Sequence, residues 1–283
     1  MDATLEDLVR QAKDGDQDAL ESIVRGIQDR VYGLALRMLG YPADAEDAAQ
    51  EILIKIVTRL GGFRQESKFT TLVYRVAANH LLTTRKRLAE QRAVSFDDYE
   101  PAYEIARAAE WQQSVPEAER RLIAQEVMLG CTQGILQCLD RRHRIAYILG
   151  EIFSLSSRQG AYILDISAAA YRKRLSRARE RIQTFMRDHC RLVKPDNPCH
   201  CDRIAPHAIQ INAIDPQNLL FAGHPCHPGG RVVSPEHLQE LDALQRIAAL
   251  FQNHPDYAAP ETFLDRLKSM IDSGPFQLIE GLH

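Results

Sequence analysis

One continuous apolar stripe at helical spacing constrains the fold of this chain more than any other feature of its sequence. Between residues 44 and 60, apolar side chains recur every three or four positions, and polar side chains fill the other positions of the first turns. The stripe consists of Ala45, Ala48, Ala49, Ile52, Leu53, Ile56, Val57 and Leu60. Because Pro42 precedes it and Gly61 and Gly62 follow it, we predict one amphipathic helix between these residues.

The remainder of residues 1–88 shows the same helical periodicity, and strand-like alternation is scarce. A second helix is predicted from about Ser67 to Leu88. Its inward-facing side chains are expected to be Phe69, Leu72, Val73, Val76, Ala77, His80 and Leu81. Periodicity is lost in residues 89–115, which read as a linker, and it returns in a helix predicted from Glu117 to Leu139.

Residues 155–182 have the layout of a helix-turn-helix. Ser156 is a suitable cap for a first helix, and residues 165–167 are suited to the turn, with Ser167 as the cap of a second helix to about Phe185. An apolar seam for docking is expected from Tyr171, Leu175, Ala178 and Ile182. The rest of the second helix is crowded with cations, namely Arg172, Lys173, Arg174, Arg177, Arg179 and Arg181.

A helix with this surface suits the major groove of DNA, where cations contact phosphates and guanidinium groups read guanine. The small side chains of Ala168, Ala169 and Ala170 would let its start approach the bases closely. A solvated basic helix is the simpler alternative, but turn, caps, seam and charge agree with DNA binding. The motif alone leaves repressor, activator and initiation factor open.

Charge and composition exclude several other classes. The net charge is -3, but residues 190–283 carry 7 Lys and Arg against 11 Asp and Glu, so residues 1–189 are almost neutral. No apolar run approaches the roughly 18 residues of a membrane span, and the acidic start lacks the layout of a signal peptide, so we expect a cytoplasmic protein without a membrane partner. No GxSxG, HExxH or phosphate-loop motif is present, so no catalytic residue and no enzymatic activity are expected.

The two helical segments together resemble a known family. Residues 44–87 resemble region 2 of the extracytoplasmic-function (group 4) sigma factors of the sigma-70 family, and residues 139–182 resemble their region 4. The resemblance covers roughly residues 5–187 in the family's order and spacing. It implies an all-α fold with region 2 at 1–90, an acidic linker at 91–115, region 4 at 116–189 and a C-terminal extension at 190–283.

The resemblance also implies partners and site residues. The partners would be bacterial core RNA polymerase, through its clamp helices and flap, promoter DNA and an anti-sigma factor. Polymerase binding would fall to Asp47, Gln50 and Glu51. The -10 element would be opened and read from the polar side of the second helix by Tyr74, Arg75 and Asn79, with phosphates held by Arg85, Lys86 and Arg87. The -35 element would be read by Ala169, Ala170, Arg172, Lys173, Arg174, Arg177 and Arg181.

Simpler explanations stay open for some of these residues. Carboxylates at the start of a helix are favoured by the helix dipole, and packing explains Tyr74 as well as base stacking does. The sequence also departs from the family: Leu72 stands where a tryptophan is common, and Arg158, Gln159 and Gly160 replace an acidic pair followed by isoleucine. Glycine inside a helix costs about 1 kcal/mol relative to alanine, so with Gly160 we expect region 4 either to be less stable or to recognise an unusual promoter element.

The extension differs in composition, since 10 of the 13 prolines and 7 of the 10 histidines lie beyond Cys190. Its first part, to about Arg231, is expected to be irregular, followed by two amphipathic helices with Ser234 as an N-cap. No cofactor is required, but Cys190, Cys199 and Cys201 could bind zinc with Cys226 or a nearby histidine as fourth ligand. Redox-active thiols and plain structural cysteines are the alternatives, and Cys131 and Cys138 are expected in the core.

The extension could therefore regulate the rest of the chain by docking on region 2 or region 4. The competing interpretation is a stand-alone helix-turn-helix regulator with a metal- or redox-sensing tail. Such a regulator would bind duplex DNA without polymerase.

Overall fold

The computed structural model describes residues 4–63, 67–83, 95–99, 111, 115–223, 241–252, 257–259, 263 and 269. In this part of the chain the named secondary-structure elements are all helical, and Cys190 and Cys199 form an isolated bridge. The predicted all-α fold is confirmed. No helix within the described ranges combines the length and the apolarity needed to cross a membrane.

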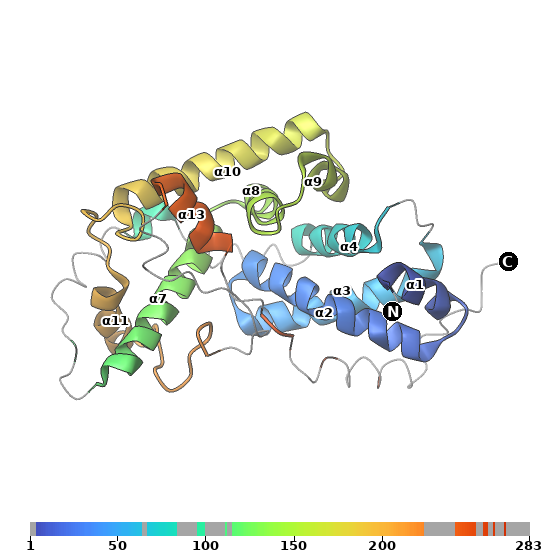
Figure 1. The fold of residues 1–283 in the computed structure, drawn as a ribbon, viewed down its shortest axis with the longest axis horizontal. Coiled ribbons are helices and arrows are strands. Elements are labelled where there is room, and N and C mark those ends of the chain that lie inside the picture. Colours follow the sequence, from blue (N-terminus) through green and yellow to red (C-terminus); the bar gives the residue numbers. More distant parts are fainter. Residues whose placement is uncertain are drawn as a thin grey trace.

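The N-terminal helices are α1 (Leu5–Lys13), α2 (Gln17–Leu39), α3 (Pro42–Thr58) and α4 (Phe69–Thr83). The long helix α2 packs against the other three (Figure 1). The predicted stripe lies on α3 and on the short 3-10 turn η1 (Leu60–Gly62) that follows it. Its eight residues are buried except for half-buried Ala48. The second predicted helix is α4 as far as Thr83, and residues 84–88 lie outside the described residues.

The second group of helices contains the predicted helix-turn-helix. It comprises α7 (Glu117–Gln137), α8 (Arg141–Tyr147), a π-helical turn η3 (Ile148–Ile152), α9 (Ser157–Leu164) and α10 (Ala168–His189). Ser156 caps α9 in a capping box with Gln159, and the Ser167 hydroxyl accepts a hydrogen bond from the Ala170 amide at 3.1 Å. Both predicted caps are confirmed, and α10 continues one turn past the predicted end.

Gly160 has a packing role that helix propensity does not reveal. A Cβ atom at this position would lie 2.2 Å from Cζ of Tyr171, whose ring is fully buried and whose hydroxyl donates to the Ala146 carbonyl at 3.1 Å. Only glycine lets α9 approach the apolar seam of α10 this closely. The expectation of a less stable region 4 rested on helix propensity alone, which does not include this close helix contact.

The start of the extension is more regular than predicted. Residues Cys201–Gln210 form helix α11 although Pro206 lies inside it. Proline cannot donate to the carbonyl four residues earlier, that of Asp202, which instead accepts a hydrogen bond from Nε1 of Trp111 at 2.9 Å. The expectation of an irregular segment was wrong here because a partner 91 positions away satisfies the freed carbonyl.

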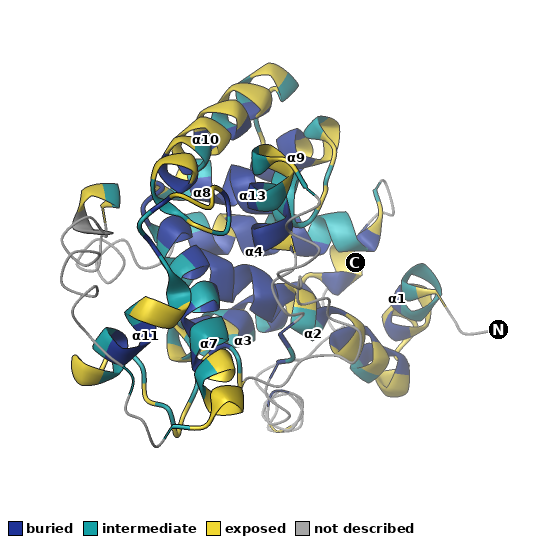
Figure 2. Cartoon of the chain, turned by 60° about the vertical axis from the view of Figure 1, so that its left-hand side comes forward, coloured by how far each residue is buried: buried dark blue, intermediate teal, exposed yellow. Residues whose placement is uncertain are grey.

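Helix α13 (Ala243–Gln252) agrees with the first amphipathic helix predicted near the C-terminus. The predicted N-cap at Ser234 and most of the last helix lie outside the described residues. The buried apolar side chains of the N-terminal helices, the helix-turn-helix and the extension form one continuous hydrophobic core. Helix α13 packs against η3 and α10 within this core (Figure 2).

A buried arginine fixes the ends of α2 and α7 side by side. Arg144 is 7% exposed, and its guanidinium donates to the carbonyls of Leu136, Gln137 and Leu139 at the end of α7. It also donates to the Met38 carbonyl at the end of α2 and to the Gln137 side chain. All five N–H groups of the guanidinium are thereby used. Burial lowers the pKa of Arg144 to about 10, which leaves it charged at neutral pH.

Candidate nucleic-acid and polymerase interfaces

The acidic residues predicted to bind polymerase lie on α3. Asp47 and Glu51 are exposed and Gln50 is half-buried. Glu51 is also connected to α4, since its Oε2 lies 3.6 Å from Nε2 of His80, whose Nδ1 lies 2.6 Å from Nζ of Lys55. This outer face of α3 thus presents carboxylates to solvent while one of them helps to position α4.

The predicted -10 side chains on α4 are not equally accessible. Asn79 is exposed, but Tyr74 is only 6% exposed because its ring stacks on Phe153, with centroids 5.3 Å apart and planes 28° apart. The expectation that Tyr74 lies on a polar side was wrong for this arrangement. Phe153 belongs to the loop after η3, which no spacing rule connects to α4.

Arg75 contacts the helix-turn-helix directly. Its Nη2 lies 3.3 Å from Oδ1 of Asp165, and its guanidinium lies 5.0 Å from the ring centroid of Tyr162. Tyr162 belongs to α9 and Asp165 is its left-handed C-cap, so α4 and α9 face each other (Figure 1). Two of the three predicted -10 side chains on α4 are therefore engaged within the chain. Arg85, Lys86 and Arg87 lie outside the described residues.

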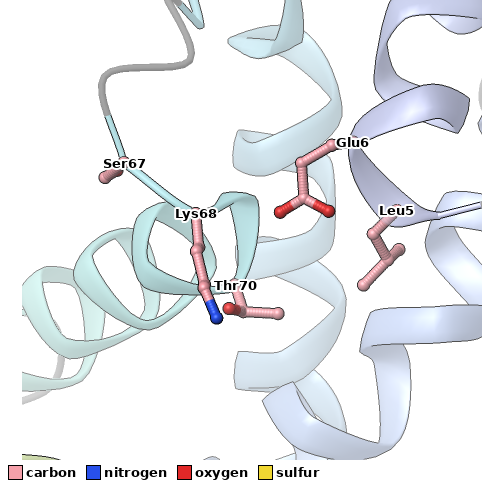
Figure 3. A pocket seen from close by; sticks show the side chains of 5 residues that line it. All are labelled: Leu5, Glu6, Ser67, Lys68 and Thr70. Carbon is pink, nitrogen blue, oxygen red and sulfur yellow. The ribbon is translucent and has the colours of Figure 1, made fainter.

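A pocket of about 570 Å³ lies at the beginning of α4, lined by Leu5, Glu6, Ser67, Lys68 and Thr70 (Figure 3). Oε1 of Glu6 accepts a hydrogen bond from the Phe69 amide at 3.3 Å. A helix N-terminus attracts anions, but here a carboxylate of the chain already holds that position. Lys68 adds a cation to the lining of the pocket.

The outer face of α10 is exposed (Figure 2), and most of the basic side chains of this helix lie on it. Ala169, Arg172, Lys173, Arg177 and Arg181 are exposed, whereas Ala170 and Arg174 are half-buried. The predicted seam is buried as expected.

Two of the cations on α10 are engaged by other parts of the chain. Arg179 donates to the Glu151 carboxylate through Nε, at 2.7 Å, and through Nη2. The guanidinium of Arg181 lies 5.6 Å from the ring centroid of Phe96 in η2 (Phe96–Tyr99). Arg172, Lys173 and Arg177 therefore form the best-placed surface for DNA.

The extension cysteines predicted to bind zinc lie near one another. Cys190 is the C-cap of α10, Cys199 faces it across the isolated bridge, and Cys201 begins α11. Cys226 lies outside the described residues. In the described ranges, no three His, Cys, Asp or Glu side chains stand in metal-binding geometry.

Comparison with known proteins gives matches to sigma factors. The family model "Sigma-70 region 2" matches residues 23–91. The ECF RNA polymerase sigma factor SigW of Bacillus subtilis is 31% identical over 191 residues, which are 66% of this chain and 100% of the relative. The RNA polymerase sigma-H factor of Pseudomonas aeruginosa is 32% identical over 178 residues, covering 62% of this chain and 90% of the relative.

The ECF RNA polymerase sigma-E factor of Escherichia coli K12 is 30% identical over 177 residues, again 62% of this chain and 90% of the relative. These matches define the class as sigma-70-type factors. The chain belongs to the family of extracytoplasmic-function (ECF) RNA polymerase sigma factors.

Proposed function

We propose that this chain directs RNA polymerase to specific promoters, with α3 docking on the polymerase clamp helices, α4 reading the opened -10 element and α10 reading the -35 element. The observation that carries the proposal is the coexistence in one chain of an acidic exposed helix and a basic helix-turn-helix, within a sequence of ECF sigma type. Sigma factors of this kind bind core polymerase and promoter DNA and are not enzymes. A stand-alone regulator would have no use for the acidic face of α3.

The direct test is initiation with purified components. The chain is mixed with bacterial core polymerase and a library of genomic fragments, and the start sites of the transcripts are sequenced. We expect transcripts from a small set of fragments that share two conserved elements, and none from core polymerase alone. Tight binding of the free chain to duplex promoter DNA without association with core polymerase would support the stand-alone regulator instead.

The outer face of α10 yields a prediction about salt dependence. Replacing Arg172 or Arg177 with alanine should weaken binding of the reconstituted polymerase complex to promoter duplex. Because each neutralised phosphate releases condensed counterions, the slope of log affinity against log salt should fall by about 1 for each phosphate that is no longer bound. Arg187→Ala, near the other end of α10, is the matched control and should change neither quantity. Equal effects of all three variants would remove the assignment of this face to DNA.

We further propose that the described arrangement is a closed state. Tyr74 and Arg75 are covered by Phe153, Tyr162 and Asp165, so α4 must separate from α9 before it reads a promoter strand. The contact is modest in energy: an exposed ion pair contributes about 0.2–1 kcal/mol and a cation–π contact about 0.5–1 kcal/mol. A free-energy difference of this size suits a closed state that binding partners can open.

The extension strengthens this closed state by contacting both halves of the chain. On the region 4 side, Glu126 of α7 is 4% exposed and accepts amide hydrogen bonds from Leu220, Phe221 and Ala222 at 2.9, 3.0 and 2.6 Å. The Phe251 ring of α13 meets Tyr147 edge-on at 5.3 Å.

On the region 2 side, the extension reaches α2 at three points. The Ala259 amide donates to Asp29 at 2.7 Å, Phe263 meets Tyr32 at 6.2 Å, and Arg37 lies 5.6 Å from the Tyr257 ring centroid. The extension therefore spans region 2 and region 4, and we propose that it regulates the factor by holding them together.

Opening the closed state should expose α4. The double variant Tyr162→Ala with Asp165→Asn removes both partners of Arg75 while asparagine keeps the left-handed backbone. Losing about 1–2 kcal/mol of contact energy shifts the equilibrium between the closed and the open state by about 5- to 30-fold. We therefore expect the free chain to bind single-stranded -10 DNA at least 5-fold more tightly. Phe263→Ala in the extension should act in the same direction. Fluorescence anisotropy with a labelled promoter strand measures the affinity of the double variant and of Phe263→Ala.

The control for this experiment is Asp188→Asn, which neutralises an exposed carboxylate on α10 without touching α4 or α9. Its affinity for the same strand should match that of the unmodified chain. Unchanged affinity in the double variant and in Phe263→Ala would mean that neither contact limits access to α4.

A further inference from the structure

A described part of the linker, the turn η2, lies against the basic helix α10. Its Phe96 ring is half-buried, and the ring centroid lies 5.1 Å from that of Phe185, with the two planes tilted by 44°. The Phe185 ring packs in turn on His189, with centroids 4.7 Å apart. A contact of three rings thus attaches η2 to the last two turns of α10.

The Phe96 ring also holds one cation of the basic face of α10. The guanidinium carbon of Arg181 lies 5.6 Å from the Phe96 ring centroid. Arg181 is exposed, and it lies between exposed Arg177 and buried Phe185 on one side of the helix, because residues four apart share a side. Phe96 therefore lies where the exposed basic face of α10 meets the core.

Negative charge follows Phe96 directly in the sequence. Asp97 and Asp98 both belong to η2, and the Asp97 side chain is exposed. Adjacent Cα atoms are about 3.8 Å apart, so docking of Phe96 brings this acidic turn to the end of the basic face. A DNA phosphate that approaches Arg181 would have to replace the ring at the guanidinium and would meet like charge beside it.

We infer that the linker competes with DNA for the C-terminal half of α10. In the free chain, Phe96 docks on Arg181 and Phe185, and promoter phosphates displace it when α10 enters the major groove. The inference rests on the proposed role of α10, and it adds a contact on region 4 itself to the closed state. Because both equilibria are linked, the docked linker and the bound DNA weaken each other by the same factor.

The contact of Phe96 is weak enough to be reversible. Phe96 is only half-buried and packs at the margin of the hydrophobic core. Partial burial of one ring and one exposed cation–π contact stabilise the docked linker modestly. A charge-assisted hydrogen bond from the guanidinium to a phosphate is strong enough to replace such a contact.

A second described point of the linker contacts region 4 and the extension. Nε1 of Trp111 donates to the Asp202 carbonyl of α11 at 2.9 Å, and the Arg120 guanidinium of α7 lies 5.6 Å from the Trp111 ring. Trp111 is the only tryptophan of the chain, so its fluorescence reports this contact separately from the contact of Phe96. Unchanged Trp111 emission in a variant at position 96 therefore shows that α7 and α11 keep their packing.

Binding of a labelled duplex to the full-length chain tests the inference. The probe is a short duplex of mixed sequence, because contacts with phosphates do not depend on sequence. Phe96→Ala removes the competing side chain and should raise the affinity by about 2- to 5-fold, the factor expected for one exposed cation–π contact. The slope of log affinity against log salt should steepen by about 1, because Arg181 then binds a phosphate. Fluorescence anisotropy at several salt concentrations measures both quantities.

Two further variants show whether the effect comes from competition at Arg181. In an Arg181→Ala background, Phe96→Ala should leave the affinity unchanged, because the side chain for which linker and DNA compete is absent. Leu122→Ala removes an exposed apolar side chain from α7 and is the control that should bind as the unmodified chain does. Equal affinity of Phe96→Ala and the unmodified chain would overturn the inference, and so would an equal gain in the Arg181→Ala background.

Arg172→Ala separates failure of the inference from failure of the proposed function. If Arg172→Ala weakens duplex binding and Phe96→Ala does not strengthen it, α10 binds DNA and only the competition is refuted. If Arg172→Ala has no effect on duplex binding, the DNA role of α10 is refuted, and the inference is refuted with it.

A photocrosslink observes the displacement directly. With p-benzoylphenylalanine in place of Phe96, we expect the free chain to crosslink to the α10 peptide that contains Phe185. The yield should fall as duplex is added, in parallel with the bound fraction of DNA. Absence of this crosslink in the free chain, or a constant yield at saturating duplex, would overturn the inference, since the linker would then not occupy the DNA face.

Discussion

Replacing Arg144 with alanine is expected to lower the free energy of unfolding by about 3–5 kcal/mol. The guanidinium is the donor for four backbone carbonyls at the ends of α2 and α7 and for the Gln137 side chain. A buried acceptor that loses its donor costs about 1–3 kcal/mol unless water replaces it. Water can reach only part of this junction. The costs of the separate unsatisfied acceptors should therefore add up to more than the cost of one. Urea denaturation followed by circular dichroism measures the change.

Two companion variants separate the hydrogen-bond network from charge and helix propensity. Arg144→Lys keeps the positive charge but cannot donate to five oxygens, so it should recover only a small part of the loss. Arg142→Ala makes the same change on an exposed side chain of the same helix and should stay within about 0.5 kcal/mol of the unmodified chain. Full recovery by lysine would mean that charge alone, without directed hydrogen bonds, stabilises the junction.

Gly160→Ala is expected to destabilise the chain by about 2–3 kcal/mol, although alanine is the better helix former. Helix propensity alone predicts a gain of about 1 kcal/mol. The added Cβ would lie 2.2 Å from Cζ of Tyr171, a ring that is fully buried and held by its hydroxyl. Overpacking of a rigid site costs about 1–3 kcal/mol and displaces α9 from α10, so packing decides the sign. Thermal and urea unfolding both measure this change in stability.

A second helical glycine provides the control. A Cβ on Gly130 of α7 would meet Phe221 at an ordinary contact distance of 3.7 Å, so Gly130→Ala should stabilise the chain by up to about 1 kcal/mol. In a Tyr171→Leu background the cost of Gly160→Ala should shrink by at least about 1 kcal/mol, because the clashing ring is gone. The same cost in both backgrounds would show that the ring is not its cause.

The sequence was sufficient wherever neighbours along one helix decide the structure. The apolar stripe of α3 and the caps Ser156 and Ser167 were predictable, because periodicity and side-chain-to-backbone hydrogen bonds are local properties. The basic outer face of α10 was predictable for the same reason. The family resemblance then supplied the class of protein, and the relatives agree with that class.

Local reasoning failed where a distant residue changes the outcome. Helix α11 forms despite Pro206 because Trp111 satisfies the carbonyl of Asp202. Tyr74 is buried because Phe153 stacks on it, and Gly160 is required because Tyr171 approaches it. In each case the deciding partner lies on another segment of the chain, and no spacing within one helix encodes that distance.

By itself, the sequence determined that this protein is helical, that it carries a basic helix-turn-helix, and that it is of ECF sigma type. Only the tertiary structure decided that α4 faces α9 and that the extension contacts both α2 and α7. The physical reason is the distance along the chain over which the deciding interactions act. Helix formation depends on residues within one or two turns, whereas access to a DNA-reading face depends on contacts made across the whole core.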